Sequence, residues 1–66
     1  MGAGGSVRPA RHILIVERDM IVGIGLAEDL LDQGFRVSGP FISSDEVLAV
    51  LSTDPPDAAI LDPALR

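Results

Sequence analysis

The fold is decided by His-Ile-Leu-Ile-Val-Glu-Arg-Asp, residues 12–19, together with a shorter counterpart, Ala-Ala-Ile-Leu-Asp, residues 58–62. Each stretch opens with a continuous apolar run, which is typical of a parallel strand that is covered on both faces. Each also ends in carboxylates: Glu17 and Asp19 close the first, and Asp62 closes the second. Ligands of open parallel sheets bind beyond the carboxyl ends of the strands, so we expect these three acids to meet at one functional edge.

A first helix is predicted to begin after Asp19, whose side chain suits an N-cap, and to end at Gly34, because glycine commonly terminates helices. Gly23 and Gly25 lower the helix propensity of this segment, and close packing against a neighbouring element is the simplest explanation for both. The predicted buried line of the helix comprises Met20, Ile24, Ala27 and Leu31, with Ile21 and Leu30 beside it.

A second strand is predicted from Phe35 to about Gly39, interrupted by Pro40 as suits a sheet edge. Ser43 and Glu46 have the spacing of a capping box. The third strand is predicted from Asp57 to Asp62, after a double proline that ends the second helix. The order β-α-β-α-β predicts an α/β fold with a parallel sheet and right-handed crossovers. The apolar face of the second helix is predicted to comprise Val47, Leu48 and Leu51.

Composition narrows the functional classes. A chain of 66 residues forms one small domain at most, and its 47% hydrophobic content suits a globular protein rather than a disordered one. The net charge of −5 and the absence of lysine leave no basic surface for nucleic acid or for an anionic membrane. Without cysteine there is neither a disulfide nor a thiolate metal site. We expect a cytoplasmic protein with a flexible, glycine-rich leader over residues 1–10.

The acidic edge is the strongest candidate for a functional site. Carboxylate oxygens suit Mg²⁺, which is usually held by one or two carboxylates and keeps several waters. The alternative is structural: Asp19 caps a helix, and Asp62 starts a turn before a proline. His12 is interpreted as a strand-end residue on the far side from the acids, and no nucleophile–base pair of an ordinary enzyme is found. The Gly23–Gly25 pair lies too far beyond the strand for a dinucleotide fingerprint.

The segment His12–Arg66 resembles the first half of a bacterial response-regulator receiver domain. The matching parts are residues 13–17, the helix end over residues 30–35, the stretch 37–40, and Pro56-Asp57-Ala58-Ala59-Ile60-Leu61-Asp62. The resemblance implies that residues 11–66 form a truncated flavodoxin-like unit, a partial receiver domain with strand order 2-1-3.

The resemblance also implies a phosphorelay function. Asp62 would accept a phosphoryl group from a histidine kinase or a phosphotransfer protein. Mg²⁺ would be held by Glu17, Asp19, Asp62 and the backbone carbonyl of Ala64. The sequence departs from the family at Arg18, which stands where the direct metal-ligating acid is expected, while Asp19 lies one residue further on. A guanidinium there could instead pair with Asp62.

Two alternatives follow from these departures. One is a pseudo-receiver that is not phosphorylated and acts as an interaction module, as a homodimer through the exposed edge of the third strand. The other is a fragment without independent function, because the family's later strands, switch Ser/Thr and phosphate-contacting lysine do not occur in this sequence. In none of these cases is a nucleic-acid or membrane partner expected.

Overall fold

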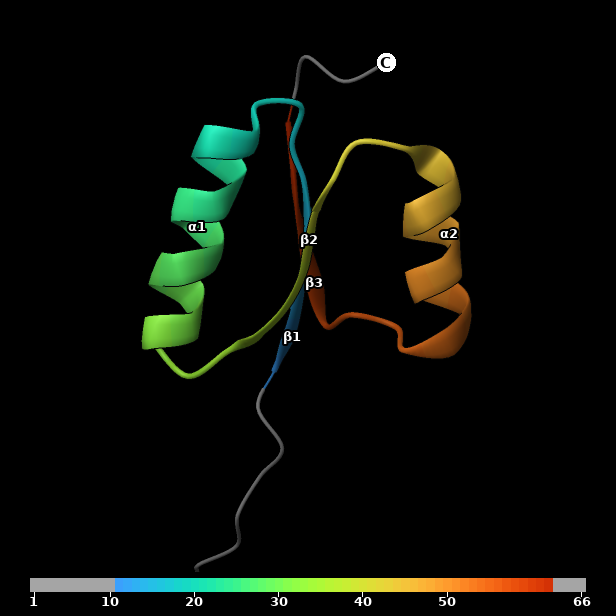
Figure 1. Ribbon diagram of the computed structural model, residues 1–66. Helices are drawn as coiled ribbons and strands as arrows, with labels where there is room; N and C mark the ends of the chain where they lie inside the picture. The colour runs from blue at the N-terminus through green and yellow to red at the C-terminus, as the bar shows by residue number, and fades with distance from the viewer. Residues whose placement is uncertain (1–10, 63–66) are drawn as a thin grey trace, which may run out of the picture.

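The computed structural model describes residues 11–62, which form a three-stranded parallel sheet with the order β2-β1-β3. Helices α1 and α2 lie on opposite faces of this sheet (Figure 1). The elements are β1 (His12–Val16), α1 (Met20–Asp32), β2 (Arg36–Phe41), α2 (Ser44–Thr53) and β3 (Ala58–Leu61). The predicted α/β class, the β-α-β-α-β order and the strand order 2-1-3 are therefore confirmed. The predicted leader and Ala64 lie outside the described residues.

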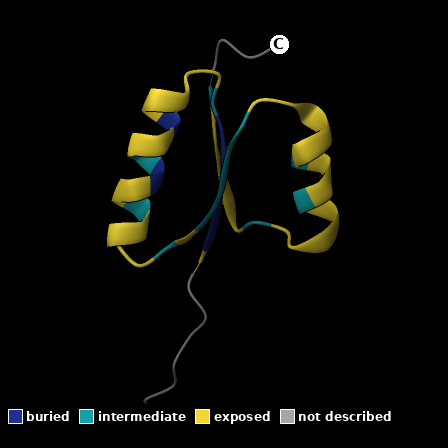
Figure 2. Ribbon diagram, in the orientation of Figure 1, coloured by how far each residue is buried: buried dark blue, intermediate teal, exposed yellow. Residues whose placement is uncertain are grey.

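Strand β1 is the core of the molecule, and all five of its residues are buried. It pairs on one side with β2 and on the other with β3, so its backbone hydrogen bonds are shared with both neighbours. Figure 2 shows the buried residues concentrated on β1 and on the side of α1 that faces the sheet. By contrast, every residue of β3 is exposed, and α2 buries none of its residues.

The ends of α1 are fixed by the two signals that the sequence indicates. Asp19 is the N-cap, and its side chain accepts hydrogen bonds from the first turn. At the other end, Gly34 adopts φ 92°, the N–H of Gly34 donates to the carbonyl of Leu31, and the N–H of Phe35 donates to the carbonyl of Leu30. This pair of bonds is a Schellman motif, in which glycine takes the left-handed position at no steric cost.

The predicted buried line of α1 is wrong in most of its members. Met20, Ile24 and Leu31 are exposed, and of the predicted line only Ala27 is buried. The helix instead turns toward the sheet a face built on Gly23, Leu26, Ala27 and Leu30, which keeps the i, i+3, i+4, i+7 spacing. Because Gly23 has no side chain, this face looks less apolar in the sequence than the predicted one. The same glycine allows the closest approach of the helix to the sheet.

Close packing explains one of the two helix glycines. A Cβ at Gly23 would lie 2.5 Å from Cβ and 2.7 Å from Cγ of Pro40, so α1 and β2 meet where there is no side chain on the helix. At Gly25, a Cβ would meet nothing within 4 Å. The expectation of close packing is confirmed for Gly23 and wrong for Gly25.

Strand β2 is longer than predicted, because it continues through Pro40 to Phe41. The pairing with β1 shifts register between Leu14 and Val16, where an irregularity accommodates the proline. Gly39 has φ 110°, and a Cβ at this position would collide with the backbone carbonyl oxygen of Ile15. Glycine therefore permits the turn of the backbone that lets the strand pass Pro40.

Helix α2 begins after Ser43, whose hydroxyl oxygen accepts a hydrogen bond from the N–H of Glu46 at 3.2 Å. The helix is half-buried only at Val47 and Val50, while Leu48 and Leu51 are exposed, so the predicted apolar face holds for Val47 alone.

Within residues 11–62, neither helix combines the length and the apolar character that crossing a membrane requires.

Candidate functional site

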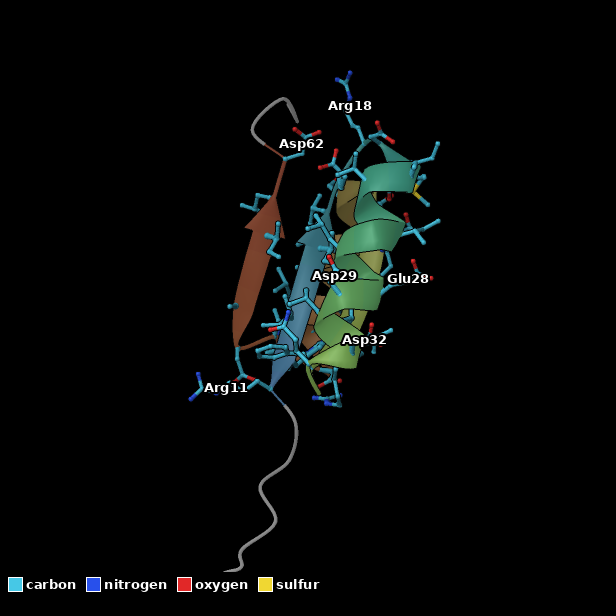
Figure 3. All side chains as sticks on the ribbon, turned by 90° about the vertical axis from the view of Figure 1, so that its left-hand side faces the viewer. Arg11, Arg18, Glu28, Asp29, Asp32 and Asp62 are labelled. Atoms are coloured by element: carbon cyan, nitrogen blue, oxygen red, sulfur yellow. The ribbon has the colours of Figure 1, made fainter. Side chains whose placement is uncertain are left out.

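The carboxyl ends of β1 and β3 bring Glu17 and Asp62 to one edge of the sheet. Val16 and Leu61 are partners across the two strands, and the N–H of Asp62 donates to the carbonyl of Val16 at 2.9 Å. Glu17 and Asp62 are the next residues along each strand, so they leave the sheet side by side. Figure 3 shows Asp62 and Arg18 at this end and Arg11 at the opposite end.

Glu17 is held in place by three elements. Its N–H donates to the carbonyl of Phe41 at 3.0 Å, which ties it to the end of β2. Its Oε1 accepts a hydrogen bond from the N–H of Asp19 at 3.0 Å. A Cβ on Gly23 would lie 3.4 Å from the Glu17 Cβ, so this side chain borders the first turn of α1. The half-buried Glu17 carboxylate therefore closes the β1–α1 loop at the sheet edge.

Asp19 caps the N-terminus of α1, which is the structural alternative to a role in metal binding. Its Oδ1 accepts from the N–H of Ile21 at 3.0 Å and from the N–H of Val22 at 3.3 Å. Both bonds satisfy donors that have no partner inside the helix. One oxygen of Asp19 and one oxygen of Glu17 are thus already used by backbone donors.

The acids of this edge are not gathered into a compact metal cage. No three Asp, Glu or His side chains of residues 11–62 are grouped closely enough to hold a metal ion. Glu17 and Asp62 nevertheless supply two hard oxygen donors at the same edge, a number that fits Mg²⁺ completed by water or by a phosphate. The structure brings these two predicted residues together and uses the third, Asp19, as a helix cap.

Arg18 is exposed on the loop between β1 and α1, directly after Glu17. Its side chain extends beyond the end of the sheet in Figure 3. The contacts between oppositely charged side chains within residues 11–62 join Asp54 to Arg36 and to His12, at the other end of the sheet. Arg18 therefore brings a permanent positive charge to the rim of the candidate site.

A polar cluster at the amino ends of the strands was missed by the sequence analysis. His12 is 2% exposed, and its Nε2 lies 2.6 Å from Oγ of Ser38 on β2. The N–H of His12 donates to Oδ2 of Asp57 at 2.7 Å, and the N–H of Asp57 donates to the carbonyl of His12 at 2.7 Å. The available signal was a histidine that opens an otherwise wholly apolar buried strand.

Arg36 and Asp54 form an exposed ion pair beside this cluster, with Nη1 of Arg36 2.9 Å from Oδ2 of Asp54. The hydrogen bond from Arg36 lowers the pKa of Asp54, and the same contact raises the pKa of Arg36.

Comparison of the chain with protein-family models, with curated proteins and with solved structures gave no match.

Proposed function

We propose that this chain is a receiver-type phosphoacceptor, with Asp62 as the residue that takes the phosphoryl group. The observation that carries the proposal is the side-by-side exit of Glu17 and Asp62 from paired parallel strands. Asp62 is half-buried at the edge where ligands of parallel sheets bind. The sequence resemblance to receiver domains gives the same role to the same residue.

The proposed step is an in-line transfer to a carboxylate. A carboxylate oxygen of Asp62 forms a bond to phosphorus while the bond between phosphorus and the donor breaks, and the donor leaves with the electron pair. The product is an acyl phosphate. Such a transfer depends on positioning and on neutralisation of the charge on the phosphoryl oxygens. Mg²⁺, which Glu17 and Asp62 would hold, supplies that neutralisation when it is bound.

Arg18 has a defined part in this proposal. A guanidinium pairs well with phosphate oxygens because its fork of donors matches their geometry. From the rim of the site, Arg18 would contribute positive charge to an incoming phosphodonor. The donor would be a histidine kinase or a phosphotransfer protein, and the chain would work in the cytoplasm as part of a two-component phosphorelay.

Intact mass measurement after incubation with a small phosphodonor tests this proposal. Wild type, Asp62→Asn and Asp29→Asn are compared with and without Mg²⁺. Asp29 is an exposed acid on α1 and serves as the matched control (Figure 3). The proposal expects the mass of one phosphoryl group on wild type and on Asp29→Asn, and none on Asp62→Asn. Labelling of all three proteins, or of none, would exclude Asp62 as the acceptor.

A second candidate function rests on the free edge of β3. Within residues 11–62, β3 is hydrogen-bonded to β1 on one side only, and its four residues are exposed. An unprotected edge strand favours pairing with another chain, which supports an interaction module that forms a homodimer. Sedimentation of wild type, Ile60→Lys and Ile21→Lys distinguishes the two functions. Only the change on β3 should abolish a dimer, since Ile21 is an exposed residue of α1.

A further inference from the structure

His12 occupies a position where all the elements at the amino end of the sheet meet. Its side chain contacts Ser38 on β2, and its backbone exchanges hydrogen bonds with Asp57, the residue before β3. Its Nδ1 lies 3.8 Å from Oδ1 of Asp54, which is the C-cap of α2. The imidazole therefore borders β2 and the end of α2, while the backbone of His12 is tied to the connection before β3.

The two ring nitrogens are not equally satisfied. Nε2 has the hydroxyl of Ser38, but Nδ1 is buried and has no hydrogen-bond partner among residues 11–62. A buried polar atom without a partner is uncommon in folded proteins and calls for an explanation. The carboxylate of Asp54, whose Oδ1 lies 3.8 Å from Nδ1, is 53% exposed.

From this geometry we propose that His12 and Asp54 form a pH-sensitive contact that fastens the α2–β3 connection to the sheet more strongly when His12 is protonated. A protonated imidazole has a donor on each nitrogen, so Nε2 would donate to Ser38 and Nδ1 to Asp54. The carboxylate has to approach by about 1 Å or less to reach hydrogen-bonding distance. In the neutral ring only one nitrogen carries a proton: the tautomer with Nδ1–H can donate to Asp54 while the hydroxyl of Ser38 donates to Nε2, but that contact carries no ion pair.

Other charged groups around the imidazole modulate this contact. Asp57, on the connection before β3, adds a second negative charge. Arg36 on β2 donates to both oxygens of Asp54, from Nη1 to Oδ2 at 2.9 Å and from Nη2 to Oδ1 at 3.5 Å. The Arg36 pair keeps Asp54 ionised through the pH range in which histidine titrates. Arg11 precedes His12 and is directed away from the sheet, and Asp32 lies at the same end on α1 (Figure 3). The contact would fasten the amino end of β3. The carboxyl end of the same strand leads to Asp62, at the opposite end of the sheet.

The test uses the fact that His12 is the only histidine of the chain. NMR titration of the imidazole is performed on the full chain as wild type, Asp54→Asn and Asp45→Asn. Asp45 is an exposed acid in the first turn of α2 and controls for net charge. The midpoint in Asp54→Asn should lie below that of wild type, because the neutral amide does not attract the protonated ring. Asp45→Asn should leave it unchanged.

Urea denaturation provides a second readout that a merely structural role would not produce. Asp54→Asn should weaken the fold more at about pH 5.5 than at about pH 8, because the contact is an ion pair only when the histidine is protonated. In a His12→Gln background the same substitution should have equal effects at both pH values. Identical midpoints in wild type and Asp54→Asn, or equal shifts in both Asn variants, would overturn the proposal.

Discussion

Replacement of the two helix glycines by alanine should have opposite effects on stability. At Gly23, the new Cβ would lie 2.5 and 2.7 Å from two carbons of the Pro40 ring. Carbon atoms are in favourable contact at about 3.5–4.0 Å, so α1 and β2 would have to separate by roughly 1 Å. The proline ring is rigid and belongs to a paired strand, so it cannot rotate away as a flexible side chain would. Overpacking of this kind costs about 1–3 kcal/mol.

Gly25 provides the matched control on the same helix. A Cβ there meets nothing within 4 Å, so alanine should only raise helix propensity and stabilise the fold by about 0.5–1 kcal/mol. The same gain applies at Gly23, where it leaves a net loss of about 0.5–2 kcal/mol. The difference between the two variants isolates the contact with Pro40.

Thermal and urea unfolding of wild type, Gly23→Ala and Gly25→Ala, followed by circular dichroism, measures this difference. In a domain of this size 1 kcal/mol moves Tm by about 4–8 °C, so the two variants should lie clearly on opposite sides of wild type. If Gly23→Ala were as stable as Gly25→Ala, the packing of α1 against Pro40 would be wrong, and with it the placement of the loop that carries Glu17.

Four further results are expected. Gly34→Ala should destabilise by about 1 kcal/mol in urea denaturation, since alanine is strained at φ 92°, and a neutral result would refute the Schellman ending. Asp19→Ala should cost about 1 kcal/mol through loss of the N-cap, whereas Asp19→Asn should retain most of it. Because Arg36 lowers the pKa of Asp54, their ion pair stabilises the folded state above about pH 4, and this stabilisation is lost as the pH falls further and Asp54 becomes protonated. The difference in unfolding free energy between wild type and Arg36→Gln should therefore shrink below about pH 4. Arg18→Asp should strengthen Mg²⁺ binding measured by calorimetry, and an unchanged affinity would show that position 18 does not contribute to the site.

The strands and their order follow from the sequence because two apolar runs without alternation demand burial on both faces, and short links between them demand parallel crossovers. The buried β1 and the shared edge of Glu17 and Asp62 were therefore predictable. The length of β2 was not, because proline is a strong argument against a strand and the compensating irregularity beside Gly39 depends on the neighbouring strand.

The orientation of the helices was the least predictable part of the fold. Large apolar residues occupy more than one line of α1, and the sequence favours the line with the largest side chains, Met20, Ile24 and Leu31. The structure turns the helix toward Gly23 and Ala27, where small residues permit close approach. At the candidate site, the sequence identified the acids and the capping role of Asp19, but not the hydrogen bond from the N–H of Asp19 to Glu17.

Chemical trapping of the phosphorylated residue tests the central claim most directly. An acyl phosphate reacts with hydroxylamine to form a stable hydroxamate at the carbon that carried the phosphoryl group, and peptide mapping by mass spectrometry then locates it. Treatment of the full chain with a small phosphodonor should place the hydroxamate on Asp62 alone. A hydroxamate on Asp54 or Asp57, at the opposite end of the sheet, would contradict the assignment of the acidic edge as the phosphoacceptor site.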